Sequence, residues 1–494
     1  MKKIVSVILA ILFVGALSAC KKEDPTLTQT RADWQLQAPA YMGGVLSANA
    51  YDTGPGMDCN LDNSAGKMQI ITGTTRAEFD AYLHKVEGND YQLIAREDIA
   101  NSTFIQYAKD GKTLYTYYVG ETNQAHVITD SASVTETQFE YTYTPSATDT
   151  TSFYQYALMN DPYGVNYNTK FDSGKSYPDC GMFYVIKTAD NRLILIDGGD
   201  NSQATDAATA GLVDFLYEIT NQQRTEKLRI ACAIVSHAHS DHYKFIDKLV
   251  SDYTQNIQLE RVAFNFPSWS SRGVNNATYE AFGNNLQTKF PSAQFMKVHT
   301  GQKITLGNVT MEIITTHEDL VSPVSGYTQI GNFNYTSTMF KFSANGKGFL
   351  AMADWGGSDV STEYNAAAKR VFDLYRTADE IYPHLKADII QAGHHGLNDL
   401  QSMYDVIGAK YAFVPQADSD FANQTNNSKA SKFTKTINDL KGAGATHIFF
   451  QSRYTYGLTI KQNGDISHSS ETMRGADDGY FEFLQKHNYG AYQN

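Results

Sequence analysis

The chain has 494 residues, and its apolar share of 42% and aromatic share of 12% are those of an ordinary globular protein. This length is enough for two or three domains, each able to bury a core of its own. The formal net charge of −13 argues against extended electrostatic binding of nucleic acid, because such binding needs clustered Lys and Arg side chains.

The N-terminus predicts export. Two lysines precede a short apolar run over residues 4–17, and Ser18 and Ala19 then lead to Cys20. This is the pattern of a secretory signal, since a membrane-spanning helix needs ~20 apolar residues. The ending Leu17-Ser18-Ala19-Cys20 resembles a bacterial lipobox, which implies that residues 1–19 are a lipoprotein signal peptide and that Cys20 carries a lipid. We therefore expect an exported protein that is lipid-anchored to the bacterial cell envelope, on its periplasmic or outer surface. An ordinary signal peptide with an incidental cysteine is the alternative.

Residues 20–36 are polar and rich in Thr, which predicts a tether, and residues 37–135 predict a small α+β accessory domain. Within that domain, Thr75 and Glu78 have capping-box spacing and open an amphipathic stretch. Strand-like runs follow at 91–94, 104–108, 113–118 and 125–128, and Asp110-Gly111 predicts a hairpin turn between the second and the third run. No cluster of catalytic residue types occurs there, and we expect surface or structural roles for the isolated His84 and His126.

Residues 136–152 are rich in Thr and Ser and predict a linker. From residue 153 to 494 the pattern changes to short apolar runs separated by helical or loop segments, which predicts a layered α/β domain. The informative runs lie at 193–196, 230–235, 349–353, 388–391, 411–414 and 447–450. Runs that are apolar on both faces suit the strands of a sheet covered by helices. Several of them end directly in polar or metal-binding residue types, at positions where a sheet holds side chains rigidly at its rim.

The strongest chemical signal follows the run at 230–235. His237, His239, Asp241 and His242 are four potential metal ligands within six residues. Imidazole and carboxylate groups are the ligands that zinc prefers, and manganese and iron also accept them. Because this cluster directly follows a buried type of strand, it predicts a metal site at the end of that strand.

The same segment resembles the His-x-His-x-Asp-His signature of the metallo-β-lactamase fold superfamily, and other segments agree with this resemblance in the family's order. Residues 193–199 look like the family's strand with its Asp-Gly-Gly turn, in which Asp197 would steady the metal loop. Residues 349–354 look like the strand that delivers a bridging carboxylate, here Asp354, and residues 388–396 look like the strand-end element, here with His394 and His395. The resemblance covers roughly residues 153–470 and implies an αββα sandwich.

The family pattern implies a centre for two divalent metal ions, with Zn2+ as the first choice and Mn2+ as the other. His237 and His239 would bind the first ion, and Asp354 would bridge both. Asp241, His242 and either His394 or His395 would bind the second ion. The resemblance also implies that a metal-activated hydroxide is the nucleophile and that the remaining histidine of the pair protonates the leaving oxygen or holds a phosphoryl oxygen. Asp241, His394 and His395 are therefore the predicted catalytic residues.

The chain departs from the family at one position. Many members have a histidine just before the strand that precedes the bridging aspartate, whereas residues 331–340 contain asparagines and no histidine. His317, further upstream, is an outside candidate for the missing ligand. The departure and the Gly-His-His-Gly ending resemble a branch that contains the hydrolase domain of competence DNA-uptake channels, to which phosphorylcholine esterases of the cell surface are similar.

That branch implies cleavage of a phosphoester or phosphodiester in a small-molecule or cell-surface substrate. One alternative is hydrolysis of a β-lactam or lactone by the same fold. The other is a surface lipoprotein that binds a ligand without turnover. Nucleic acid is not the expected substrate, because Lys244 and Lys248 are the only cations close to the ligand motif.

Overall fold

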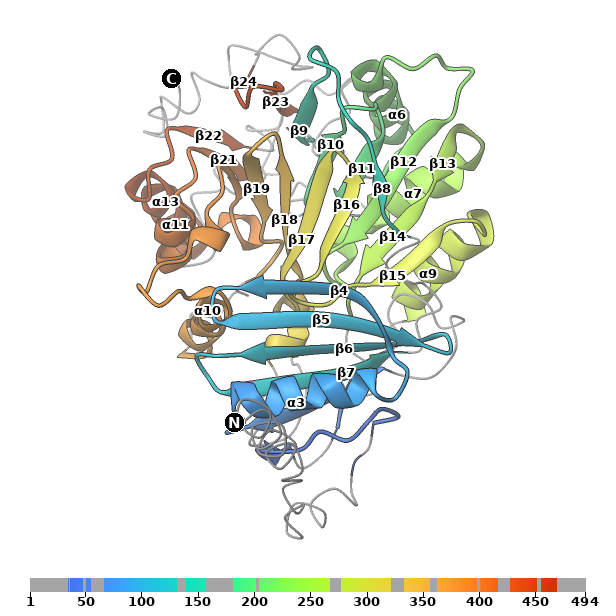
Figure 1. Cartoon of the computed structure of the whole chain (residues 1–494). Coiled ribbons are helices and arrows are strands. Elements are labelled where there is room, and N and C mark those ends of the chain that lie inside the picture. Colours follow the sequence, from blue (N-terminus) through green and yellow to red (C-terminus); the bar gives the residue numbers. More distant parts are fainter. Residues whose placement is uncertain are drawn as a thin grey trace, which may run out of the picture.

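The computed structural model describes residues 34, 36–47, 50–54, 66–130, 139–156, 158, 181–200, 204–266, 277–320, 333–355, 362–397, 400–415, 427–450 and 455–468. Their strands form three sheets (Figure 1). The expected signal peptide and most of the expected tether lie outside the described residues. None of the described helices is long and apolar enough to cross a membrane.

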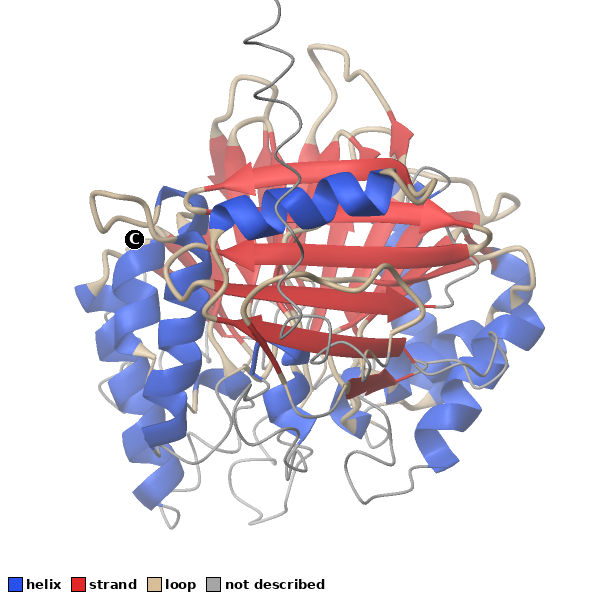
Figure 2. Cartoon of the chain, turned by 60° about the horizontal axis from the view of Figure 1, so that its bottom comes forward, coloured by secondary structure: helices blue, strands red, loops and turns tan. Residues whose placement is uncertain are grey.

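The first sheet is antiparallel and lies at the lower end of the molecule in Figure 1. Its strands, in spatial order, are β1 (Val45–Leu46), β3 (Gly66–Thr72), β7 (Gln124–Asp130), β6 (Lys112–Val119), β5 (Ser102–Lys109) and β4 (Gln92–Ile99), and β2 (Tyr51–Gly54) pairs with β3. Helix α3 (Arg76–Glu87) lies across its outer face (Figure 2). The predicted capping box is confirmed, since Thr75 Oγ1 accepts from Glu78 N and Glu78 Oε2 accepts from Thr75 N. The predicted hairpin is confirmed as well, with Asp110 and Gly111 between β5 and β6 at φ 51° and 75°.

The second and third sheets face each other. The order of the second is β15 (Gln294–Lys297), β14 (Arg261–Phe264), β12 (Leu228–Val235), β11 (Leu193–Asp197), β10 (Phe183–Lys187), β9 (Thr151–Gln155), β23 (Tyr456–Ile460) and β24 (Ile466–His468), with β13 (Ile257–Leu259) beside β12. The order of the third is β22 (His447–Phe450), β21 (Tyr411–Val414), β20 (Ile389–Gln391), β19 (Lys347–Ala351), β18 (Met339–Ala344), β17 (Val309–Thr315), β16 (Lys303–Gly307) and β8 (Tyr141–Thr142).

Helices cover the outer faces of these two sheets. Those beside the second sheet are α6 (Asp206–Thr220), α7 (Lys244–Asp252) and α9 (Ala277–Lys289). Those beside the third sheet are α10 (Thr362–Tyr375), α11 (Gln401–Ile407) and α13 (Asn427–Gly442). Alternate residues of β11 take part in different cores: Ile194 and Ile196 pack between the sheets, whereas Leu193 and Leu195 pack under the helices. The four layers confirm the predicted αββα sandwich and explain why its strands are apolar on both faces.

The first sheet packs against one end of this sandwich, where its strands run across the ends of β14 to β17 (Figure 1). Leu114 and Tyr118 of β6 pack under α3, whereas Tyr115, Tyr117 and Val119 belong to the same core as the sandwich. Phe104 of β5 also belongs to that shared core. The segment expected to be a small accessory domain therefore has two buried faces, one of which is completed by the sandwich.

The described part of the expected linker is likewise built into the sandwich. Tyr141 and Thr142 form β8, which pairs in parallel with β16, and β9 already begins at Thr151. Phe139 is buried, and its carbonyl accepts a hydrogen bond from Arg261 Nε. A composition rich in Thr and Ser indicated a free connection here, but the backbone of these residues pairs with strands from distant parts of the chain.

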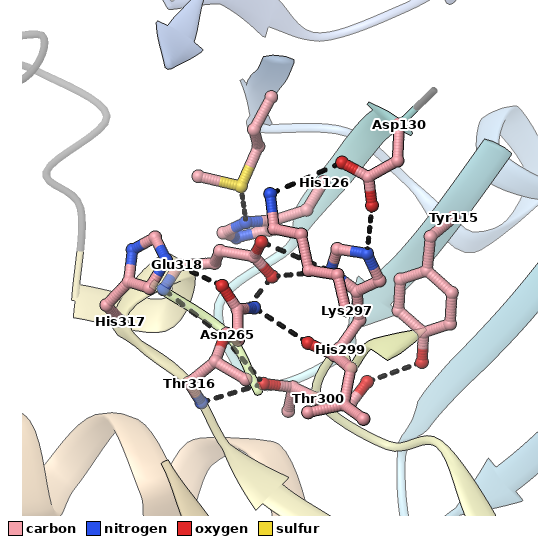
Figure 3. A network of polar contacts seen from close by, with 12 residues as sticks. Tyr115, His126, Asp130, Asn265, Lys297, His299, Thr300, Thr316, His317 and Glu318 are labelled. Carbon is pink, nitrogen blue, oxygen red and sulfur yellow. Dashed lines mark hydrogen bonds and ion pairs between the residues drawn. The ribbon is translucent and has the colours of Figure 1, made fainter. Parts of the chain in front are cut away.

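A buried polar network joins the first sheet to the sandwich (Figure 3). His299 lies between two carboxylates, with Nε2 2.5 Å from Asp130 Oδ2 and Nδ1 2.9 Å from Glu318 Oε2. Burial opposes the charge on this imidazole, but Glu318 and Asp130 outweigh burial and raise the pKa of His299 to about 9. All three side chains are buried, so their charges depend on one another. Asp130 belongs to the first sheet, whereas His299 and Glu318 belong to the sandwich, so the complete set of charges needs the docked arrangement.

This network predicts a loss of stability at alkaline pH. The pKa of His299 is raised from 6.5 to about 9, so its stabilising charge is fully present below pH 6.5 and is lost as the pH rises through 9. We expect the midpoint of unfolding in urea to fall across this window in the parent protein. In His299→Gln the urea midpoint should already be lower at pH 6.5, and it should change less between pH 6.5 and pH 9 than in the parent. An equal alkaline loss in the variant would show that another group causes it.

Candidate metal centre

The predicted ligands come from three strand ends and meet at one edge of the sandwich. His237 and His239 follow β12, and Asp241 and His242 lie in the short helix η1 (Ser240–His242). Asp354 follows β19, and the pair at 394–395 opens the short helix η6 (His394–Gly396) after β20. Strands β19 and β20 are parallel neighbours, so their polar ends lie side by side.

The ligand atoms form two groups that share one carboxylate. Asp241, His242, Asp354 and His395 make the first group, and His237, His239 and Asp354 make the second; within each, the ligand atoms lie within 4.8 Å of one another. Oδ1 of Asp354 is 3.4 Å from His242 Nε2 and 3.4 Å from His395 Nε2, whereas its Oδ2 is 3.8 Å from His237 Nε2. Each oxygen of Asp354 therefore faces a different group, as a bridging carboxylate must.

The side chains of the four-residue group fit a divalent ion. His242 Nε2, His395 Nε2 and Asp354 Oδ1 are buried and have no hydrogen-bond partner among the residues that the structure describes. Buried polar atoms in native proteins are nearly always satisfied, so atoms that converge without partners indicate a ligand. The donor set of two imidazoles and two carboxylates suits zinc or manganese.

The neighbours of these ligands orient them. Asp197 Oδ2 is 2.8 Å from His242 Nδ1, and both its oxygens accept from Ser236, at 2.8 Å from the backbone N and 2.9 Å from Oγ. His395 Nδ1 is 3.0 Å from the carbonyl oxygen of Pro415 in the same way. Each imidazole thus holds its Nδ1 in a hydrogen bond and presents Nε2 to the group, which is the usual arrangement of metal-binding histidines.

The turn after Asp197 needs glycine. A Cβ on Gly198 would lie 2.6 Å from the Cβ of Ile246, and the Gly198 carbonyl accepts from the backbone N of Phe245 at 2.7 Å. The close approach that the Asp-Gly-Gly turn implied is therefore present between this turn and α7.

The charges of the imidazoles and carboxylates in this cluster depend on one another. Burial alone would lower the pKa of His242, but Asp197, Asp354 and Asp241 raise it well above its usual range. Asp354 outweighs burial in the same way and raises the pKa of His395 to about 10. Conversely, the imidazoles hold the pKa of Asp354 well below its ordinary value despite its burial. A divalent ion must displace the protons on these imidazoles, so metal affinity should increase with pH.

The backbone at the ligands is left-handed at positions without glycine. Asp197, Ala353, His394 and His395 have φ angles of 58°, 51°, 46° and 55°. Such conformations are uncommon outside Gly, Asn and Asp, and they cost on the order of 1–3 kcal/mol each where the surrounding structure enforces them. Their concentration beside the ligand groups is typical of a site whose side chains are held in place by the fold.

The two histidines of the 394–395 pair have different places. His395 belongs to the four-residue group, whereas His394 belongs to neither. His394 Nε2 is 3.7 Å from Asp354 Oδ2 and 3.1 Å from Nδ2 of the buried Asn334. This geometry favours His395 as the metal ligand and leaves His394 at the border of the site.

Asn334 is the residue that the sequence analysis did not assign. It lies in the short helix η4 (Phe333–Thr336), within the asparagine-containing segment that lacks the family's histidine. The backbone N of Thr338 donates to the carbonyl oxygen of Ser236 at 3.0 Å, which ties this segment to the ligand loop. The signal in the sequence was the position of the asparagines, and only the fold shows which one reaches the site.

Three other histidines named in the sequence analysis lie away from the two ligand groups. His317 is buried in the docking network, where Nε2 is 2.8 Å from Asn265 Oδ1 (Figure 3). Its Nδ1 is 2.9 Å from Tyr51 Oη. It joins neither ligand group, so it does not replace the missing histidine. His126 is buried at the same interface, and His84 is exposed on α3, in agreement with their expected structural and surface roles.

No protein-family model and no curated protein sequence matches the chain. Solved structures do resemble it. The metallo-β-lactamase fold protein YhfI from Bacillus subtilis is 12% identical, with a TM-score of 0.34, over 63% of this chain and 99% of its own. Zn2+-bound PqqB from Methylobacterium extorquens is 11% identical, with a TM-score of 0.28, over 53% and 78%. The short form of human tRNase Z is 11% identical, with a TM-score of 0.26, over 53% and 90%. These similarities are weak, and the fold is identified by its layers, its strand order and the place of its ligands. The chain has the αββα sandwich that its resemblance to the metallo-β-lactamase fold predicts, with a cluster of histidine and aspartate side chains at one edge.

Proposed function

We propose that the protein is a metal-dependent hydrolase that cleaves a phosphoester or phosphodiester bond outside the cytoplasm. The observation that carries this proposal is the pair of ligand groups that share Asp354. When bound there, two divalent ions, with zinc as our first choice, would supply a hydroxide from water and stabilise the charge of an in-line displacement. A nucleophile from the chain is then not required.

The chain's own residues would bind the ions, transfer a proton and hold the ligands in position. Asp241, His242 and His395 would hold one ion, His237 and His239 the other, and Asp354 both. His394 stands at the border of the site, where its Nε2 accepts from Asn334 Nδ2. A role in passing a proton to the leaving oxygen would require the amide of Asn334 to turn and present Oδ1 to a protonated Nε2. Asp197 would keep His242 and the loop at Ser236 in position.

The ligand set favours phosphoester chemistry over the cleavage of a β-lactam or lactone. The segment before β18 offers Asn334 and no histidine, so the second group has only two imidazoles and the shared carboxylate. Hydrolysis of bis(p-nitrophenyl) phosphate, compared with that of a chromogenic cephalosporin, tests this choice. Cleavage of the cephalosporin alone would overturn it, and the absence of bound metal after incubation with zinc and manganese would favour a binding protein.

The histidine pair provides a direct test of the assignment. We expect His395→Ala to lose bound metal, because it removes a ligand of the four-residue group. His394→Ala should keep its metal and lose turnover by roughly 10²- to 10⁴-fold, the range of a general acid. Metal per chain is measured by mass spectrometry and turnover with bis(p-nitrophenyl) phosphate, and the exposed His84→Ala is the matched control. If neither variant changed turnover, the proposed site would be wrong.

We also propose that the chain is lipid-anchored through Cys20, as its N-terminal sequence predicts. The support is the lipobox-like ending alone, since residue 20 lies outside the described residues. Incorporation of labelled palmitate into the parent and its loss in Cys20→Ser is the expected result. Equal labelling of the two would refute the anchor and leave the hydrolase proposal untouched.

A further inference from the structure

A cavity of about 270 Å³ lies at the seam between the first sheet and the sandwich. One side is formed by residues of β6, β7 and the turn between them, and the other by α10 and the short helix η3 (His317–Leu320). None of its lining residues belongs to the two ligand groups of the metal centre. The cavity is therefore a separate site, and it exists only while the first sheet is docked.

Arg370 of α10 is the distinctive residue of this cavity. Its side chain is half-buried, and burial lowers the pKa of its guanidinium. Within the described part of the chain it makes one hydrogen bond, from Nη1 to the carbonyl oxygen of Asp319 at 3.3 Å, and no ion pair with a carboxylate. A guanidinium has five N–H donors and is the side chain best suited to bind carboxylate or phosphate oxygens. A half-buried arginine with unused donors at a cavity indicates an anionic ligand.

The two carboxylates of the cavity are already satisfied. Asp319 accepts from Tyr117 Oη at 2.7 Å, from the hydroxyls of Thr300 and Thr315 at 2.5 and 2.8 Å, and from a backbone N–H. Asp373 pairs with Lys369, with both its oxygens within 2.9 Å of Nζ. Neither acid makes an ion pair with Arg370 within the described residues, although Asp319 lies close enough for its charge to act on Arg370, so Arg370 is the cation of the lining that a ligand can still pair with.

Further polar groups face the same cavity. The side chains of Thr122 and Gln124 line it, are partly buried and make no hydrogen bond within the described residues. His126 contributes an acceptor: because Tyr117 Oη donates to Asp319, it must accept from His126 Nδ1–H at 3.0 Å, which leaves the lone pair on Nε2. The lining thus offers several donors around Arg370 and an acceptor on His126, next to two carboxylates that are already hydrogen-bonded.

We propose that this cavity binds a small oxyanion, a phosphate or a carboxylate, through Arg370 with Gln124 and Thr122 as additional donors. A ligand that also carries an O–H group, such as hydrogen phosphate, can donate that hydrogen to His126 Nε2. The site does not depend on the metal centre or on the proposed hydrolysis. It assigns a binding role to the N-terminal segment, which supplies one wall of the cavity.

Binding is measured by titration calorimetry on the chelator-treated mature chain, residues 20–494, so that no metal can hold the anion. Inorganic phosphate and acetate are used in separate titrations. We expect saturable binding of at least one of them to the parent, weakened about tenfold or more in Arg370→Met, because the charge-assisted hydrogen bonds are lost. Arg376→Met is the matched control: this arginine follows the same helix but pairs with Glu380 and Glu121 outside the cavity. It should bind like the parent.

Gln124→Ala provides a second variant in case Arg370→Met unfolds. It removes a partly buried side chain without a hydrogen bond, and it should weaken binding several-fold. Binding of phosphate alone, acetate alone or both would support the proposal and identify the ligand class. The proposal is overturned if neither anion binds saturably to the metal-free parent, or if both variants bind as the parent does. Because turnover is not measured, failure here would leave the hydrolase proposal standing.

Discussion

Replacing Asp354 with alanine is expected to remove all tightly bound metal and to abolish hydrolysis. Its Oδ1 faces His242 and His395, and its Oδ2 faces His237, so both ligand groups lose an oxygen in one substitution. The carboxylate is 1% exposed, and solvent therefore cannot readily take its place. The two groups predict near two equivalents of metal in the parent, and we expect near zero in Asp354→Ala.

Mass spectrometry of the native protein measures metal per chain, and cleavage of bis(p-nitrophenyl) phosphate measures turnover. Asp388→Ala is a suitable control, because Asp388 precedes β20 at the end away from the metal centre and pairs there at 2.8 Å with Lys347, the first residue of β19. The control should keep its metal and most of its activity. Retention of both ions in Asp354→Ala would rule out a bridging role, and loss of metal in both variants would indicate a general effect on folding.

Much of this centre could be predicted from the sequence because its ligands are local. His237, His239, Asp241 and His242 follow one strand, and that strand is apolar from Ile230 to its end at Val235. Asp354 and the 394–395 pair also directly follow their strands, so strand order alone brought them to one edge. A side chain whose position depends only on where a strand ends can be placed from the sequence.

The separate roles of His394 and His395 could not be predicted from the sequence. Both residues have a left-handed backbone, and their side chains are separated by contacts to distant segments. His395 is fixed by the carbonyl of Pro415 and His394 by the amide of Asn334. No local pattern encodes contacts between residues that are tens of positions apart.

The docking of the first sheet was left open, because the sequence predicted only an accessory or packing domain, although a signal for docking was present. The run Leu114–Val119 is apolar on both faces, and only one of those faces is covered by α3. A small domain exposed to solvent would show polar residues on its second face. Strands that are apolar on both faces indicated covered sheets in the sandwich, and the run of β6 indicates in the same way that β6 packs against another layer.

Phe104→Ala is the substitution that tests whether the first sheet and the sandwich unfold together. Phe104 is 2% exposed, and its ring stacks on Tyr117 of its own sheet and on Tyr375 of α10. It lies so close to Gly301 that a Cβ there would be 2.1 Å from the ring. Truncation of a buried Phe costs about 3–5 kcal/mol, and here the cavity would open in the shared core.

Phe79→Ala is the matched control, because Phe79 of α3 is also buried and stacks on Tyr118 at the other face of the same sheet. Scanning calorimetry of the parent and both variants separates two outcomes. If the sheet is an integral part of the fold, the transition that unfolds the sandwich shifts downward in Phe104→Ala, and the parent shows no earlier transition for residues 37–130. If the sheet is an independent accessory domain, both variants shift an early transition and leave that of the sandwich unchanged. We expect the first outcome, because a core shared by two sheets and a buried imidazolium held by Asp130 and Glu318 couple the two parts directly.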